Sequence, residues 1–319
     1  MKTRLWLAFT LASLTVAGCA PDEIPQPAVP VAPIVVAPPP PPPPAPVAAL
    51  PAPPPEPTPA PVPAMTHSGA TLSWYGHAAF KLVTPGGKVI WFDPWITNPK
   101  NPSGKDDLAK IDKADLILIS HGHFDHIGDA VSIAKKTHAK LVTTYDLGRA
   151  IVDTFGYPKE AAGFDSQGNV GGDVTFFDGE VTVSFVPAVH SSTVSKDDAK
   201  GNSVSGLRPG GEPGGFVVTI KNGPVIYHTG DTDVFADMAT IAEFHKVTVM
   251  LACIGDHFTM GPDRAAEAVR LVAPGMVVPM HYGTFPVLTG TPEALAAAVK
   301  KKGLATQVKP MAVHETLTL

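Results

Sequence analysis

The chain has 319 residues, with 24 Lys and Arg against 29 Asp and Glu, so its formal net charge at pH 7 is −5. This balance argues against a nucleic-acid-binding surface, because the neutralisation of phosphates needs clustered Lys and Arg. The two cysteines can form at most one disulfide, which excludes a scaffold held together by disulfides.

Residues 1–18 have the pattern of a secretory signal, in which two basic residues precede an apolar run over 5–17. These 13 residues are too few to span a bilayer, which takes roughly 20. The ending Val16–Cys19 resembles a bacterial lipoprotein box and implies cleavage before Cys19 and acylation of its thiol. Because Ala20 follows, the resemblance implies a lipid anchor in the outer membrane of a Gram-negative host, facing the periplasm.

Residues 19–65 read as a tether. Between Pro21 and Pro63 lie 21 of the 36 prolines, with too few bulky apolar side chains for a core. Such a segment favours extended polyproline II, which rises about 3.1 Å per residue. The alternative is a ligand for a proline-reading domain. We expect a single globular domain over 66–319.

In that domain, short apolar runs alternate with helical patterns. The predicted strands cover 72–74, 80–83, 88–92, 116–119, 174–177, 181–186, 216–220, 225–228, 247–252 and 277–280, and the predicted helices cover 129–137, 264–272 and 292–302. Turn residues predict hairpins at Pro85–Gly87 and Asn222–Gly223. The order favours an α/β fold in which helices cover two mixed sheets. A glycine-rich phosphate loop is absent, which argues against that class of nucleotide hydrolase.

Four potential metal ligands follow the buried strand 116–119 within six residues: His121, His123, Asp125 and His126. The end of a strand can point the side chains of His121 and His123 in one direction, while those of Asp125 and His126 point toward a neighbouring position. Imidazole and carboxylate together suit zinc, iron or manganese. Without a cation such a cluster would be costly, so the pattern predicts a metal site.

Three further candidates lie just past strands: His190, Asp231 and His281. With these, the pattern H-x-H-x-D-H and the later His, Asp and His resemble the metallo-β-lactamase superfamily. The resemblance implies a four-layer αβ/βα sandwich with the metals at one sheet edge. It implies that His121, His123 and His190 hold the first metal, that Asp125, His126 and His281 hold the second, and that Asp231 bridges them.

Four stretches narrow the branch: Trp74–Phe80, Phe92–Trp95, Asp256–Pro262 and His281–Pro286. They resemble the ascorbate-6-phosphate-lactonase-like group of metal-dependent hydrolases over about residues 70–318. A more distant similarity is to the phospholipase D that cleaves N-acyl phosphatidylethanolamine. The export signal departs from the usual cytoplasmic members, which argues against a cytosolic sugar phosphate as substrate.

The metals predict the mechanism. Two divalent ions, zinc or else manganese or iron, would hold a bridging hydroxide that attacks a small-molecule lactone, ester or amide. These rank ahead of a phosphodiester because no basic cluster marks a phosphate pocket. Asp231 would orient the hydroxide, and Asp125 would pass a proton to the leaving group if the second site empties. The alternative is a non-catalytic envelope lipoprotein that binds a metal or a small ligand.

Several nearby residues receive narrower expectations. His77 is expected to hydrogen-bond substrate or a ligand carboxylate, with a structural turn residue as the alternative. Asp93 is expected to accept from a ligand imidazole or to cap a loop. His228 and His257 are read as structural or surface residues, with a position beneath the metal loop as the alternative for His228 and one facing the pocket as the alternative for His257. Residues 196–215 read as a loop that covers the cleft or is a solvated insertion, and Tyr282 and Phe285 as pocket lining or core.

Overall fold

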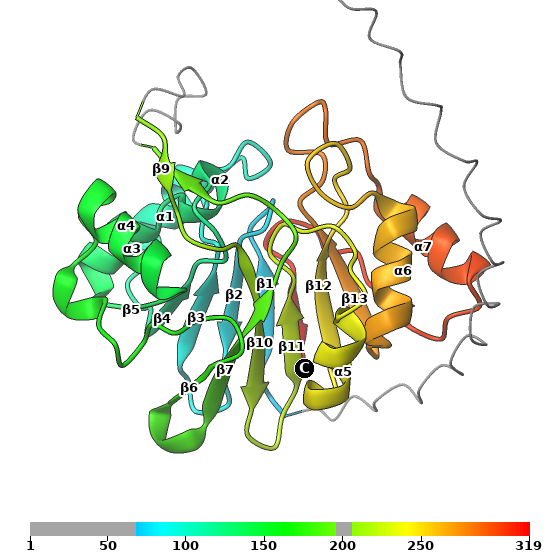
Figure 1. Cartoon of the computed structure of the whole chain (residues 1–319), viewed down its shortest axis with the longest axis horizontal. Coiled ribbons are helices and arrows are strands. Elements are labelled where there is room, and N and C mark those ends of the chain that lie inside the picture. The colour runs from blue at the N-terminus through cyan, green and yellow to red at the C-terminus, as the bar shows by residue number, and fades with distance from the viewer. Residues whose placement is uncertain (1–67, 196–205) are drawn as a thin grey trace, which may run out of the picture. The chain divides into compact units, whose positions relative to one another are not determined.

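The computed structural model describes residues 68–195 and 206–319. Over these residues, a pair of β-sheets packs face to face, and helices cover the outer face of each sheet (Figure 1). The four-layer α/β sandwich predicted from the sequence is confirmed. The predicted signal, the tether with Cys19, and loop residues 196–205 lie outside the described residues. Among the residues described, no helix is both long and apolar enough to cross a membrane.

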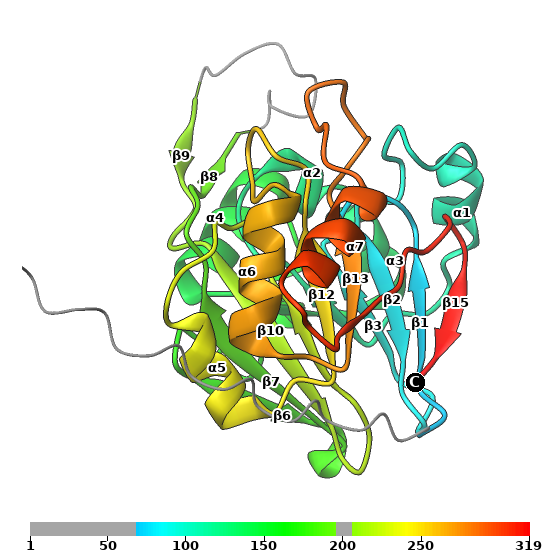
Figure 2. The ribbon, with the colours of Figure 1, turned by 90° about the vertical axis from the view of Figure 1, so that its right-hand side faces the viewer.

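The first sheet has six strands in the order β15-β1-β2-β3-β4-β5. They are β15 (Thr316–Thr318), β1 (Thr71–Trp74), β2 (Phe80–Val83), β3 (Val89–Phe92), β4 (Leu116–Leu118) and β5 (Lys140–Val142). β1, β2 and β3 form an antiparallel meander, and β4 and β5 add in parallel. The C-terminal strand β15 pairs with β1 and so lies at the sheet edge (Figure 2).

The second sheet has seven strands in the order β14-β13-β12-β11-β10-β7-β6. They are β14 (Gln307–Val308), β13 (Met276–Met280), β12 (Val249–Cys253), β11 (Val225–His228), β10 (Gly214–Ile220), β7 (Val181–Pro187) and β6 (Asp173–Phe176). β6, β7, β10 and β11 are antiparallel, whereas β11 to β14 run parallel. Both sheets are therefore mixed, as the sequence predicts.

Helices flank the two sheets on opposite sides. The first group is α1 (Gly104–Lys110), α2 (Phe124–Ile127), α3 (Ala130–Thr137) and α4 (Tyr145–Phe155), and the second is α5 (Met238–His245), α6 (Pro262–Val272) and α7 (Pro292–Lys301). Two 3₁₀ turns cover Lys159–Ala161 and Phe177–Gly179. A short ribbon pairs β8 (Thr193–Val194) with β9 (Arg208–Pro209).

Strand periodicity divides the core into two clusters. In β3, Ile90 and Phe92 pack between the sheets, whereas Trp91 packs under the first group of helices. In β4, Leu118 faces the other sheet and Ile117 faces the helices. Because successive side chains point to opposite faces, a strand buried on both sides must be apolar throughout, which is why these runs show no alternation.

The structure corrects some boundaries. The loop predicted over 196–215 is shorter, because Gly214 and Gly215 already pair with β7 and 208–209 form β9. The strand predicted over 247–252 begins at Val249 and continues to Cys253. The helix predicted from Arg264 begins at Pro262, where the missing N–H of proline is harmless.

Candidate metal centre

Loops that follow four strands bring the predicted ligands together. The loop after β4 carries His121, His123, Asp125 and His126, and the loops after β7, β11 and β13 carry His190, Asp231 and His281. A cap at His123 starts α2, which places the two following candidates in its single turn. Three groups could hold a metal ion, with ligand atoms within 4.8 Å of one another: His121, His123 and His190; His77, Asp125, His126 and His281; and His121, His126 and Asp231.

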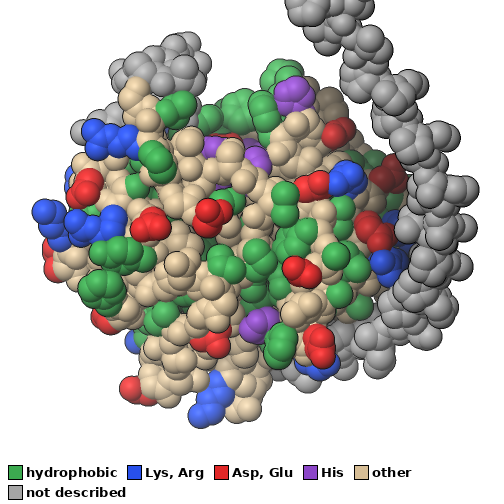
Figure 3. Space-filling model, viewed as in Figure 1, with side chains coloured by type: hydrophobic (Ala, Val, Ile, Leu, Met, Phe, Trp, Pro, Cys, Tyr) green, Lys and Arg blue, Asp and Glu red, His purple; other side chains and the backbone are tan. Residues whose placement is uncertain are grey.

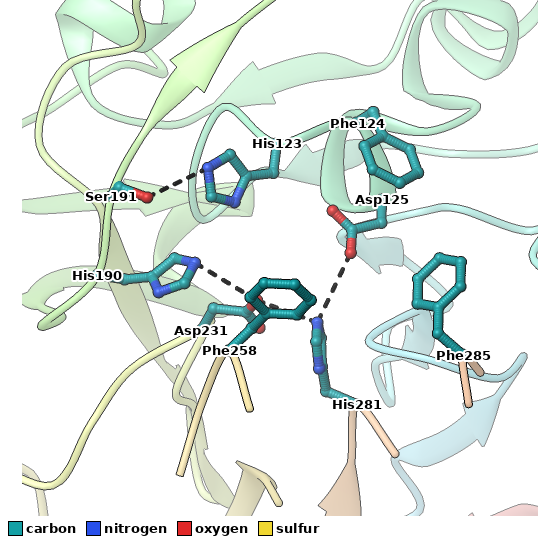
Figure 4. A pocket seen from close by; sticks show the side chains of 9 residues that line it. All are labelled: His123, Phe124, Asp125, His190, Ser191, Asp231, Phe258, His281 and Phe285. Carbon is teal, nitrogen blue, oxygen red and sulfur yellow. Dashed lines mark hydrogen bonds and ion pairs between the residues drawn. The ribbon is translucent and has the colours of Figure 1, made fainter. Parts of the chain in front are cut away.

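The carboxylate of Asp231 lies between the first two groups. Its Oδ2 is 3.0 Å from His281 Nε2, 3.3 Å from His126 Nε2, 3.7 Å from His190 Nε2 and 4.0 Å from His121 Nε2. Figure 4 shows His190 and His281 approaching this carboxylate from opposite sides. One oxygen therefore contacts imidazoles that belong to both groups.

Several of these buried atoms have no hydrogen bond. They are His126 Nε2, both ring nitrogens of His281, and Asp231 Oδ1. Buried polar atoms are normally hydrogen-bonded, so a convergent set that makes ion pairs but no hydrogen bonds needs an explanation. Imidazole nitrogens and carboxylate oxygens at these spacings are ligands of divalent transition metals. The donor set and its atoms without hydrogen bonds therefore fit a bound cation.

The charges within the cluster are strongly coupled. Burial opposes ionisation of Asp231, but the positive charges of His126 and His281 outweigh it and hold its pKa well below the usual value. The same carboxylate overcomes the effect of burial on His281 and raises its pKa to about 9. In the protein without metal, protonated imidazoles thus neutralise buried carboxylates, which is the charge that a bound cation would supply.

Asp93 orients two of the imidazoles. It is fully buried, and its Oδ2 accepts from His126 Nδ1 at 2.7 Å and from Ser120 Oγ at 2.7 Å, while its Oδ1 accepts from Ser120 N at 2.8 Å. Because the Ser120 hydroxyl donates to Asp93, it must accept from His121 Nδ1 at 3.0 Å. Both imidazoles therefore carry a proton on Nδ1, so Nε2 is the atom of each ring that would serve as a metal ligand.

His77 is fully buried, and both ring nitrogens have partners. Nε2 donates to Asp125 Oδ2 at 3.0 Å, so Nδ1 accepts from Thr284 Oγ1 at 2.9 Å. Burial, followed by the charge of His281, lowers the pKa of His77 to about 4, in line with a neutral ring. Its backbone carbonyl accepts from His281 N at 3.0 Å. Of the two contacts expected for His77, the ring therefore makes the one to a carboxylate and has no nitrogen left for a substrate.

A cavity of about 450 Å³ opens onto the cluster. It is lined by His123, Phe124, Asp125, His190, Ser191, Asp231, Phe258, His281 and Phe285 (Figure 4). On the surface, histidine side chains lie in a hollow near the upper edge of the view, flanked by hydrophobic side chains (Figure 3).

The structure agrees with some of the expectations for the other nearby residues and differs from others. Phe285 lines the cavity, but Tyr282 stacks on Trp74 with ring centres 5.7 Å apart. His228 is buried next to the centre and stacks on Phe92. The exposed His257 is not among the lining residues.

Sequence reasoning missed several residues that the structure brings to the site, among them Ser191, which lines the cavity, and Ser120, which donates to Asp93. Thr284 holds His77, and Phe124 and Phe258 line the cavity. In the sequence, Phe124 stands between the ligand candidates His123 and Asp125, and this position could have marked it as a residue of the site. Phe258 and Thr284 lie in the stretches Asp256–Pro262 and His281–Pro286 that carried the resemblance, but the resemblance gave neither residue a role.

Comparison with known proteins identifies the family. A beta-lactamase superfamily domain matches residues 88–282. A UPF0173 metal-dependent hydrolase of Thermodesulfovibrio yellowstonii is 51% identical over 252 residues, which are 79% of this chain and 93% of the relative. A UPF0173 metal-dependent hydrolase of Archaeoglobus fulgidus is 43% identical over 238 residues, 74% of this chain and 94% of the relative.

A solved structure agrees with these relatives. Igni18, a metallo hydrolase from the archaeon Ignicoccus hospitalis, is 35% identical, with a TM-score of 0.66 over 78% of this chain and 98% of that chain. The predicted enzyme class, a metal-dependent hydrolase, is thereby confirmed. The chain belongs to the UPF0173 metal-dependent hydrolase family of the metallo-β-lactamase superfamily.

Proposed function

We propose that this protein hydrolyses a neutral carbonyl substrate at a centre of two divalent cations, zinc being the expected metal. His121, His123 and His190 would hold one ion, Asp125, His126 and His281 the other, and Asp231 would bridge them. The observation that carries the proposal is the position of Asp231 Oδ2, within 4.0 Å of imidazole nitrogens from both groups. A carboxylate shared between two cations needs this placement.

When bound, such ions make water nucleophilic near neutral pH and polarise the substrate oxygen. The side chains of this protein position the reactants. Asp231, which lines the cavity, would accept from the attacking water and direct it at the carbonyl carbon. If the second site empties, Asp125 would be free to take the proton of the attacking water and pass it to the leaving atom; as a ligand of the second ion it would carry no proton. His77 is a positioning residue, since it holds Asp125 through its ring and His281 through its carbonyl.

The lining supports a lactone, ester or amide ahead of a phosphodiester. None of the described residues that line the cavity is Lys or Arg. A transferring phosphoryl group is commonly held by such cations in addition to metal ions. The similarity of four sequence stretches to the lactonase-like group also favours a carbonyl substrate.

Elemental analysis of the purified protein tests the centre directly. We expect about two transition-metal ions per chain, and we expect His121→Ala to lose metal and turnover of p-nitrophenyl esters. His245→Ala is the matched control, because His245 lies on α5 and does not line the cavity. A His121→Ala protein with full metal content and full activity would refute the assignment.

We also propose that residues 1–18 direct export and that Cys19 is acylated, which anchors the hydrolase domain of residues 66–319 to the cell envelope through the proline-rich segment. The sequence pattern at Val16–Cys19 supports this. The predicted location is the outer membrane of a Gram-negative host, on the periplasmic side.

Mass spectrometry of the protein isolated from membranes tests the anchor. We expect an N-terminal peptide that begins at an acylated Cys19, and we expect Cys19→Ser to leave the protein unprocessed. Recovery of an unmodified Cys19 peptide from active, exported protein would contradict the proposal.

A further inference from the structure

Three phenylalanines line the cavity beside the ligand cluster, and they lie on two walls. Phe124 and Phe285 stand on the Asp125 side, and Phe258 stands in front of Asp231 and His281 (Figure 4). At about 450 Å³ the cavity lies within the usual range of ligand pockets, about 300–1,000 Å³. The three rings form much of the apolar lining that a substrate meets beside the cluster.

The first wall is a packed aromatic shelf. Trp95 stacks on Phe285 at 5.9 Å between ring centres and meets Phe124 edge-on at 5.5 Å. His77 contacts both Trp95 and Phe285 edge-on, at 5.3 and 6.1 Å. The shelf is thus continuous with the residues that hold the ligands. It offers a fixed apolar surface next to the reacting centre.

The second wall is different, because Phe258 has little support. Its side chain is 59% exposed, and its ring contact is with the neighbouring His257. The residues before it, Asp256 and His257, have φ values of 65° and 52°, in the left-handed region that Asp and His adopt more often than most residues with a Cβ. Backbone bonds from Asp256 N to Met260 O and from Met260 N to Thr232 O hold the loop in this conformation.

The exposed ring of Phe258 stands over the polar centre, and a bound apolar group would remove its surface from water. Phe244, on α5, is also exposed, at 75%, but it does not line this cavity. Away from the cluster, the described lining residues include no cation that would pair with a negative group on the substrate.

We propose that the portion of the substrate remote from the scissile carbonyl is uncharged and apolar, and that it binds between Phe124 and Phe285, which Trp95 supports, and the ring of Phe258. This rests on the proposed carbonyl hydrolysis and adds the substrate class, an ester or lactone with an alkyl or aryl substituent. Phe258 is then a specificity-determining residue that contacts the substrate and takes no role in the chemistry.

Matched esters test the proposal on the full chain in detergent, loaded with zinc. p-Nitrophenyl butyrate and mono-p-nitrophenyl succinate share the leaving group and differ at the acyl end in charge. We expect kcat/KM at least tenfold higher for the butyrate. From acetate to butyrate we expect a rise of about fourfold per methylene, the value for a buried methylene group.

Phe258→Ala should raise the KM for p-nitrophenyl butyrate about fivefold, within the range of one aromatic contact, and leave kcat within about twofold. Phe258→Tyr should retain the wild-type KM, and Phe244→Ala is the matched control for removal of an exposed ring. Zinc content should be unchanged in all three variants.

The outcomes separate the two proposals. If no ester is hydrolysed by zinc-loaded protein, the proposed function fails. If esters are hydrolysed but the succinate is preferred, or if Phe258→Ala leaves the KM unchanged, the proposed function stands and this inference is overturned.

Discussion

The carboxylate of Asp93 should control how tightly the centre binds metal, although it is not among the proposed ligands. In Asp93→Asn the Ser120 N–H, which can only donate, requires the amide oxygen to face it. The amide nitrogen then replaces Oδ2 and faces His126 Nδ1, which lies 2.7 Å from Oδ2 in the native protein. Because an NH₂ group can only donate, His126 must accept at Nδ1 and carry its proton on Nε2, where no lone pair remains for a metal.

The expected loss follows from this change of tautomer. Residues that orient metal-binding histidines contribute about 10- to 100-fold in metal affinity, or about 1.4–2.7 kcal/mol. The backbone at Asp93 has φ 39°, a conformation that Asn tolerates as well as Asp, so the fold should persist. We therefore expect weaker metal binding in a folded protein.

Competition with a chromophoric chelator measures the affinity, and thermal unfolding checks the fold. Asp115→Asn is a matched control, since Asp115 Oδ2 accepts from Val89 N at 2.7 Å but contacts no imidazole. If Asp93→Asn binds zinc within twofold of the unsubstituted protein, the assigned tautomer of His126 is refuted.

Two further predictions concern stability. Burial raises the pKa of Cys253 from 9.0 to about 11, so Cys253 should not react with thiol reagents at pH 8 in the folded protein. The stability that the neutral thiol contributes should be complete below pH 9 and lost toward pH 11, and unfolding curves across this range would reveal the loss. Rapid labelling of Cys253 at pH 8 would contradict the raised pKa. Gly230→Ala should have a lower free energy of unfolding than Gly156→Ala. Both glycines have positive φ, where a residue with a Cβ costs about 1–2 kcal/mol. A Cβ at Gly230 would in addition lie 2.5 Å from Gly214 O, whereas a Cβ at Gly156 would meet open space. Equal unfolding free energies in denaturant titrations would refute the clash.

The sequence predicts most strands well because their signals are local. The hairpin at Pro85–Gly87 joins β2 to β3 as expected, and the strand predicted over 225–228 has those bounds. The predicted elements omit the helix Tyr145–Phe155, although Leu147 and Ile151 are four residues apart and buried on one face. They also omit β15, whose three residues become a strand only because β1 supplies the pairing edge.

By itself, the sequence determined which side chains could bind metal. Histidine and aspartate directly after apolar strands are costly unless a cation pairs with them, so His121, His190, Asp231 and His281 could be selected from residue type and position. Their order along the chain also carried the resemblance to the family. Both signals are properties of short segments.

Only the tertiary structure decided how these side chains meet. The hydrogen bond from His77 to Asp125 spans 48 positions in the chain, and that from Thr284 to His77 spans 207. The tautomers set by Asp93 and the aromatic walls around Phe258 depend on loops from both sheets. Such contacts arise because the packing of the two sheets determines where each loop lies in space. A local sequence pattern does not encode the distance between residues of different loops.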